Sequence, residues 1–296
     1  MTTKISFLLI FFVTLVACKP KPNELNVPGY ELDTGEIEIS GEAMEDIIQN
    51  ISSPIEMAAL IKDLGVSFQQ EYLIDPEVTN SFTTNFKMAY TLGMLGADLG
   101  YLNVYEKTST SINYLTAINR LADALKISQF FDFNTLKRLA TNNTNLDSLV
   151  YLSVHSFNRM DEHLRLTDRG NLSALMIAGV WIEGMYQATR VIQKQNNSAF
   201  AEQIGEQKLI LNDLILILEN YSRDEDFSSL IDDYKSLKKS FDNVKITYKT
   251  GEPRAIEENG MLMIVQQEYS VVDVTPQTLE EIIEKTAFIR DKHLRI

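Results

Sequence analysis

Residues 88–105 read MAYTLGMLGADLGYLNVY, and this stretch decides how the rest of the chain must be arranged. It is apolar on almost every side of a helix, which is typical of a helix enclosed by other helices. Gly93, Gly96 and Gly100 fall on one stripe, where they would admit a neighbouring helix closely. Each glycine inside a helix costs about 1 kcal/mol relative to alanine, so a close contact has to offset that cost. We therefore expect a mainly α-helical fold with this helix in its core.

Helical patterns flank this stretch on both sides, with short polar joints between them. The segment Ser53-Pro54-Ile55-Glu56 combines a capping serine, a proline at the first helical position and a glutamate three residues after the cap. The patterns predict helices over 54–64, 80–106, 110–127, 134–141, 146–166, 171–194, 198–221 and 226–242. Short joints between successive helices indicate stacked antiparallel helical hairpins.

The chain changes character after residue 243, so we divide it into a helical domain (41–243) and a smaller part (244–296). In the smaller part, Val244–Tyr248 alternates in polarity, Gly251-Glu252-Pro253 resembles a turn, and Met261–Val274 is largely apolar, which predicts a small β-hairpin. Thr275-Pro276 then begins a C-terminal helix that packs on the helical domain. Its expected apolar face is Leu279, Ile282, Ile283, Thr286 and Ile289, and its basic end is Arg290, Lys292, His293 and Arg295.

Two of the predicted helices resemble each other. A shift of 85 residues aligns the segment 92–101 with the segment 177–186, so that an acid followed three residues later by tyrosine recurs among small and apolar residues. An internal duplication of a helical hairpin would explain this recurrence. The alternative is that two buried helices have converged on small and apolar side chains, which allow close packing.

The N-terminus predicts export and lipidation. A short basic start is followed by an apolar run and by Leu15-Val16-Ala17-Cys18, an arrangement that resembles the lipobox of bacterial lipoproteins. We expect residues 1–17 to be a signal peptide, Cys18 to carry the lipid, and the proline-rich, polar residues 18–40 to form a flexible tether. The alternative is that Cys18 lies within an uncleaved or ordinary signal.

Composition narrows the possible functions. The formal net charge of −14 argues against nucleic acid as a partner. It also argues against binding of the protein to an anionic bilayer through basic surface patches. The chain has one cysteine, and its acylation would leave no thiol for a disulfide, a metal or a nucleophile. The Gly-x-Ser-x-Gly, P-loop and Rossmann patterns are missing from their proper settings. We therefore predict no cofactor and no metal site, and we assign no catalytic residue.

Two motifs carry a resemblance to a known group of proteins. The Gly-x-x-Gly-Ala-Asp-Leu-x-Tyr pattern within Gly93–Tyr101 and the Gly-x-Trp-Ile-Glu-Gly-x-Tyr pattern of Gly179–Tyr186 resemble those of uncharacterised helical lipoproteins of Bacteroidota. The resemblance covers about residues 80–295. It implies a helical fold and a place in the cell envelope, with the outer membrane preferred over the inner one. No activity is assigned to that family, so no catalytic residue is transferred.

Asp98 and Glu183 are the sharpest candidates for a functional site. Each lies in an apolar helix, where a carboxylate is desolvated unless it is paired or hydrogen-bonded. If the two hairpins pack with pseudo-symmetry, the two acids could approach each other across the core. Together with nearby aromatic side chains they would form a ligand site, whose candidate members are Asp98, Tyr101, Tyr105, Trp181, Glu183 and Tyr186. The alternative is that each acid locks neighbouring helices through hydrogen bonds.

These observations predict a lipid-anchored protein of the cell envelope, held to the membrane by its N-terminal lipid. We expect it to bind a small molecule or a protein partner, or to act as a scaffold, rather than to be an enzyme. The alternative function is that of an envelope hydrolase or lyase that uses Asp98 and Glu183 as paired carboxylates. Both the periplasmic and the surface face of the membrane stay open as locations.

Overall fold

The computed structural model describes residues 54–294 apart from 142–145, 196, 252, 259–260 and 266–267. All of the described residues belong to one compact unit. The predicted signal peptide, Cys18 and the tether lie outside them. The helices are α2 (Pro54–Asp63), α3 (Asn85–Val104), α4 (Thr108–Ala124), α5 (Phe133–Thr141), α6 (Leu146–Leu166), α7 (Gly170–Lys194), α8 (Ser198–Glu219), α9 (Glu225–Phe241) and α10 (Pro276–Leu294), with short 3₁₀ helices η1 (Gln70–Tyr72), η2 (Pro76–Ser81) and η3 (Ser128–Phe130). The predicted mainly α-helical fold is therefore confirmed.

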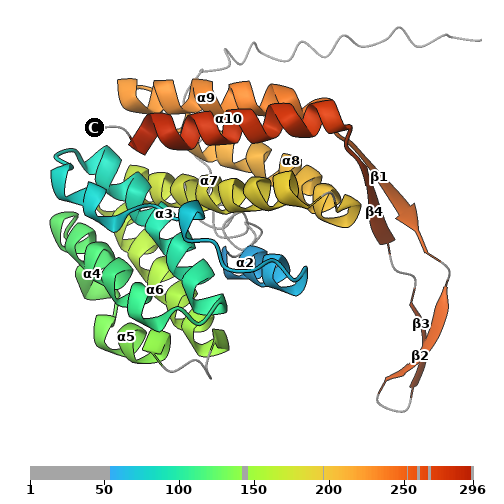
Figure 1. Ribbon diagram of the computed structural model, residues 1–296, viewed down its shortest axis with the longest axis horizontal. Coiled ribbons are helices and arrows are strands. Elements are labelled where there is room, and N and C mark those ends of the chain that lie inside the picture. Colours follow the sequence, from blue (N-terminus) through green and yellow to red (C-terminus); the bar gives the residue numbers. More distant parts are fainter. Residues whose placement is uncertain are drawn as a thin grey trace, which may run out of the picture. The chain divides into compact units, whose positions relative to one another are not determined.

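Helices α3 and α7 form the centre of the fold and make the most extensive contact between any two helices (Figure 1). They run in the same general direction, because Gly93 lies against Met176 while Asp98, further along α3, reaches Gln187, further along α7. The remaining helices surround this pair, as the apolar sequence of α3 predicts. Among the described residues, no helix combines the length and the apolar content that a membrane span requires.

Only part of the predicted glycine stripe is used for close packing. A Cβ atom at Gly93 would lie 2.0 Å from the carbonyl oxygen of Met176, so only glycine fits there. A Cβ at Gly96, by contrast, would meet no atom within 4 Å. Of these two positions only Gly93 is needed for the contact between α3 and α7, and the expectation that Gly96 also admits a helix is wrong.

The predicted helix over 80–106 is two elements. Residues 76–81 form η2, and α3 begins only at Asn85, because Thr84 caps it by accepting a hydrogen bond from the amide of Lys87. At its other end the chain reverses through Glu106, which has a φ of 59°. The amide of Lys107 then donates to the carbonyl of Leu102, which closes a turn typical of helix C-termini. This turn sends α4 back antiparallel to α3.

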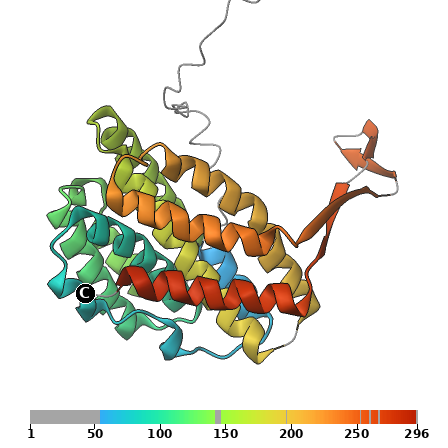
Figure 2. The same cartoon turned by 90° about the horizontal axis from the view of Figure 1, so that it is seen from above.

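The predicted small β-hairpin is present and consists of two successive antiparallel strand pairs. Strand β1 (Lys245–Thr250) pairs antiparallel with β4 (Glu268–Asp273), and β2 (Arg254–Glu258) pairs antiparallel with β3 (Met261–Val265). Helix α10 follows and packs on α7 and α9 (Figure 2). The apolar face predicted for α10 is buried, apart from a partly exposed Leu279. This packing brings the C-terminal part of the chain against the central helices.

Candidate functional site

Asp98 of α3 and Glu183 of α7 meet in the core, together with Arg290 of α10. Arg290 binds Glu183 with two hydrogen bonds, from Nε to Oε2 at 2.7 Å and from Nη2 to Oε1 at 2.8 Å. The same guanidinium lies 3.9 Å from the ring centroid of Tyr186, and its Nη2 also donates to the carbonyl of Tyr72 at 3.3 Å. A two-point contact of this kind is the strongest geometry available to an arginine and a carboxylate. It ties α10 to α7.

The carboxyl group of Asp98 is equally engaged. Its Oδ2 accepts a hydrogen bond from the backbone amide of Ile74 at 2.9 Å, and its Oδ1 accepts one from Nε2 of Gln187 at 2.9 Å. It also interacts with the carboxyl group of Glu183, and this interaction affects the pKa of both acids. Asp98 and Glu183 are both completely buried. We call Asp98, Glu183, Gln187 and Arg290 the buried acid cluster.

The electrostatics assign one proton to this cluster. Burial, and next the negative charge of Glu183, raise the pKa of Asp98 well above its usual value. Burial also raises the pKa of Glu183, while the charge and hydrogen bonds of Arg290 oppose that rise. Because Arg290 pairs with Glu183 and not with Asp98, the proton belongs on Asp98 and the negative charge on Glu183. The cluster is then electrically neutral, as a desolvated site requires.

The other residues of the hypothetical ligand site lie in different places. Tyr101 accepts a hydrogen bond from the amide of Gln69 at 3.1 Å, and Tyr105 donates to the carbonyl of Val66 at 2.6 Å. Their two rings are 4.7 Å apart. Both tyrosines therefore hold the segment that leads into η1. Neither of these hydrogen bonds reaches the carboxyl groups.

Trp181 and Tyr186 lie in two different parts of the fold. The Nε1 of Trp181 donates to Gln207 of α8 at 3.0 Å, and its ring lies 5.8 Å from that of Tyr234 of α9. Tyr186 instead lies beside the acid cluster, with Arg290 on its ring. The six residues proposed from the sequence are thus distributed over three neighbourhoods, of which one contains Asp98, Glu183 and Tyr186.

Arg290 is the residue of the cluster that we misinterpreted from the sequence. The sequence places it only among the basic residues that end the last helix, and it is 7% exposed. A signal was available, because Arg290 follows Ile282 by eight residues and Thr286 by four and therefore continues the apolar stripe of α10. A charged residue on such a stripe needs a buried partner.

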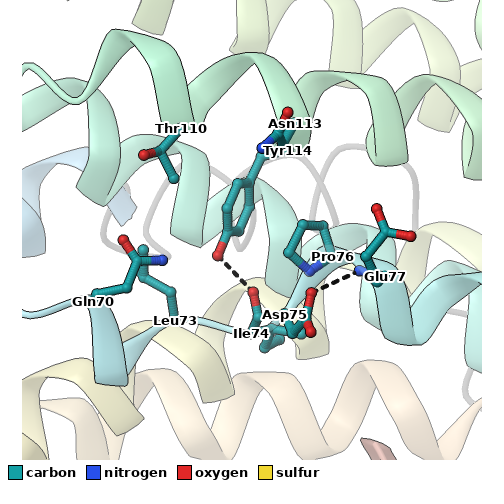
Figure 3. A pocket seen from close by; sticks show the side chains of 9 residues that line it. All are labelled: Gln70, Leu73, Ile74, Asp75, Pro76, Glu77, Thr110, Asn113 and Tyr114. Carbon is teal, nitrogen blue, oxygen red and sulfur yellow. Dashed lines mark hydrogen bonds between the residues drawn. The ribbon is translucent and has the colours of Figure 1, made fainter.

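An open pocket of 380 Å³ lies next to the cluster, between α4 and the segment that runs from η1 into η2 (Figure 3). Its lining residues are Gln70, Leu73, Ile74, Asp75, Pro76, Glu77, Thr110, Asn113 and Tyr114. No lysine, arginine or histidine is among them. No sequence pattern indicates this pocket, because it lies on a connection between predicted helices.

Ile74 separates the pocket from the buried acids. Its carbonyl accepts a hydrogen bond from the hydroxyl of Tyr114 at 2.5 Å, which Figure 3 shows, and its amide donates to Asp98 on the other side. The residues next to it are fixed as well, because the carbonyl of Tyr72 binds Arg290. We call residues 72–74 the strap. It is held by side chains of α3, α4 and α10, and it separates the buried acid cluster from the pocket.

Comparisons of the chain with models of protein families, with curated proteins and with solved structures gave no match in any of the three.

Proposed function

We propose that this chain is a lipid-anchored binding protein of the bacterial cell envelope, at the outer membrane in preference to the inner one. The anchor rests on the lipobox-like sequence that ends in Cys18 and on the polar, proline-containing tether after it. The binding role rests on the described residues. They provide an open pocket, whereas both candidate catalytic acids are enclosed.

The burial of Asp98 and Glu183 is the observation that carries the choice of binding over catalysis. A general acid or base must come within hydrogen-bonding reach of its substrate. Both carboxyl groups have no exposed surface, and their oxygens are occupied by Arg290, Gln187 and the amide of Ile74. This arrangement favours the interpretation that the acids lock helices together. It gives no support to the alternative of an envelope hydrolase or lyase.

The pocket of Figure 3 suits a small polar ligand that is neutral or positively charged. The carboxylates of Asp75 and Glu77 stand at its edge, and Gln70, Thr110 and Asn113 add amide and hydroxyl groups. With no cationic side chain in the lining, a phosphate or carboxylate ligand would lack a partner. The apolar side chains of Leu73, Ile74 and Pro76 would contact the carbon skeleton of the ligand.

The anchor is tested by membrane fractionation of cells that express the full chain and are fed an alkyne-labelled palmitate. We expect Cys18→Ser to lose the label and to leave the membrane fraction. The neighbouring variant Lys19→Ala is the control, and it should keep both. An unlabelled wild-type protein, or membrane retention of Cys18→Ser, would contradict the proposal.

The pocket is tested by calorimetry of the Cys18→Ser chain with putrescine as a cationic probe and glucose as a neutral one. We expect binding of at least one probe and its loss in Asn113→Leu. Thr116→Leu is the matched control, because Thr116 is also exposed and lies about one turn further along the same helix but does not line the pocket. If neither probe binds, or if Thr116→Leu is as defective as Asn113→Leu, the pocket is not the binding site.

A further inference from the structure

The strands β1 to β4 form a ribbon that is rooted on α8 at one end only. Val272 of β4 fits against Gly205, where a Cβ atom would lie 2.5 Å from its Cγ1, and Ser270 donates a hydrogen bond to Glu206 at 2.6 Å. Beyond this root the ribbon continues into β2 and β3. In the described part of the chain no helix packs along these two strands (Figure 1, Figure 2).

The two distal strands differ in sequence. Strand β3 is Met-Leu-Met-Ile-Val, without a charged or polar residue, whereas β2 carries Arg254, Glu257 and Glu258. Successive residues of a strand alternate between its two faces, so an uninterrupted apolar run is typical of a strand covered on both sides. A two-stranded ribbon on its own is at best marginally stable in water. Strand β3 therefore has the composition of an interior strand in the position of an edge strand.

The outer edge of β3 is the one suited to pairing. Its inner edge is paired with β2, and no described strand pairs with its outer edge. Charged residues are the usual protection of a free edge, and β2 has them while β3 does not. On β4, which follows β3 through the polar sequence Gln266-Gln267-Glu268, Tyr269 is 53% and Val271 is 36% exposed.

We propose that this edge binds a second copy of the chain, by antiparallel pairing of β3 with the β3 of the other copy. A twofold axis at Met263 would place it opposite the partner's Met263. Leu262 would lie opposite the partner's Ile264, and Met261 opposite the partner's Val265. Every pair is apolar, so the strand is complementary to itself, as a twofold interface requires. The result is a four-stranded sheet at the end of two arms.

Charge favours a second copy over a bilayer as the occupant. Glu257 and Glu258 lie opposite Leu262 and Met261 in the β2–β3 register, so insertion of the distal ribbon would carry two carboxylates into hydrocarbon. Two copies with a net charge of −14 each repel one another. However, the six residues of β1 and the five of β2 correspond together to roughly 35 Å of strand, and surface charges are screened over about 8 Å at physiological salt. The arm therefore allows pairing at its tip while the helical bodies stay apart.

The first test is sedimentation velocity of the Cys18→Ser chain over a range of concentrations. We expect a monomer–dimer equilibrium, and we expect Met263→Lys to weaken the dimer by about tenfold or more. Thr247→Lys places the same charge on the exposed part of β1 and is the matched control, which should dimerise like the parent. Circular dichroism should show the same helix content in all three proteins.

The second test locates the interface. The chain has one cysteine, so Met263→Cys in the Cys18→Ser background carries a single thiol. Mild oxidation should give a disulfide-linked dimer with Met263→Cys and none with Thr247→Cys. A monomer at every concentration, or a dimer that Met263→Lys leaves intact, would overturn the proposal. Binding of a monomeric chain to phosphatidylethanolamine–phosphatidylglycerol vesicles, lost in Met263→Lys, would overturn it in favour of the bilayer.

Discussion

Gly93 and Gly179 make the same contact in opposite directions across the α3–α7 crossing. A Cβ at Gly93 would lie 2.0 Å from the carbonyl oxygen of Met176, and a Cβ at Gly179 would lie 2.0 Å from the carbonyl oxygen of Tyr90. Both the two glycines (179 − 93) and the two carbonyl residues (176 − 90) are 86 residues apart. The contact is thus reciprocal, with an offset one residue larger than the 85 inferred from the sequence. The duplication itself stays a prediction.

The reciprocal contact predicts a strong effect of Gly93→Ala and Gly179→Ala. Each added methyl group would meet a backbone carbonyl, which cannot turn away as a side chain can, so the two helices must separate. We expect each variant to lose about 2–3 kcal/mol of the free energy of unfolding, at the upper end for overpacked cores. Urea denaturation followed by circular dichroism measures the loss.

Gly96→Ala and Gly184→Ala are the controls for this prediction, because a Cβ at either position meets no atom within 4 Å. Since alanine favours the helix, each should gain up to about 1 kcal/mol. Equal behaviour of all four variants would show that helix propensity, and not the crossing contact, decides the result.

Removal of Arg290 is expected to be among the most damaging single changes. Arg290→Met leaves the charge of Glu183 buried without its partner, and breaking a buried pair in this way costs about 3–5 kcal/mol. Arg190→Met is the control, because Arg190 lies over the same Tyr186 ring at 4.7 Å but is partly exposed and pairs with no carboxylate of the described residues. Thermal unfolding of both variants measures the difference.

The double variant Arg290→Met/Glu183→Gln separates the ion pair from simple packing. If the pair is the cause, adding Glu183→Gln to Arg290→Met restores part of the lost free energy, because no unpaired charge remains. A double variant whose loss equals the sum of the two single losses would mean that Arg290 acts only through its packing.

The helices were predictable because each carries its own pattern. The Ser53–Glu56 capping signal, the apolar run of α3 and the periodicity of α10 act over a few residues, and the structure has helices at all three places. The approach of Asp98 to Glu183 was also inferred, from the recurrence of an acid in two similar helices. That inference needed only the assumption that similar helices pack in similar ways.

The partners of the two acids could not be inferred, because they depend on tertiary contacts between distant parts of the chain. Arg290 lies 107 residues after Glu183, and no local pattern connects them. The amide of Ile74 belongs to a connection without periodicity, and a backbone donor has no sequence signature. The hydrogen bond of Trp181 to Gln207 likewise depends on how α8 crosses α7. Periodicity indicates which side of a helix is buried, but it does not identify the facing residue.

The proton on Asp98 predicts a pH dependence with a definite sign. The raised pKa means that the folded chain keeps this proton while the unfolded chain releases it near the ordinary value of 3.8. Its stabilising contribution is therefore complete below about pH 3.8 and is lost as the pH rises towards the folded pKa, with a slope of at most about 1.4 kcal/mol per pH unit.

Asp98→Asn should remove this dependence, because an amide is neutral at every pH. Near pH 4 we expect the variant to be about 1 kcal/mol less stable than the wild type, because its amide nitrogen cannot accept one of the two hydrogen bonds that the carboxyl oxygens accept. This deficit should shrink and then reverse as the pH rises. Urea denaturation at several pH values gives the difference in free energy of unfolding between the two proteins. The contributions of the other titrating groups are the same in both proteins and cancel in this difference. A difference that does not change with pH would mean that Asp98 is ionised in the folded chain.

The strap predicts a local effect of Tyr114→Phe that a global measurement would miss. The variant removes the hydroxyl that donates to the carbonyl of Ile74, which should cost about 1 kcal/mol. Because the amide of the same residue donates to Asp98, loosening the carbonyl should also loosen the amide. We expect hydrogen exchange at the Ile74 amide to accelerate, and Tyr105→Phe, which removes a similar hydrogen bond to Val66, to leave it unchanged. If both variants accelerate this amide equally, the exchange reports global unfolding, and the strap is not an independent element.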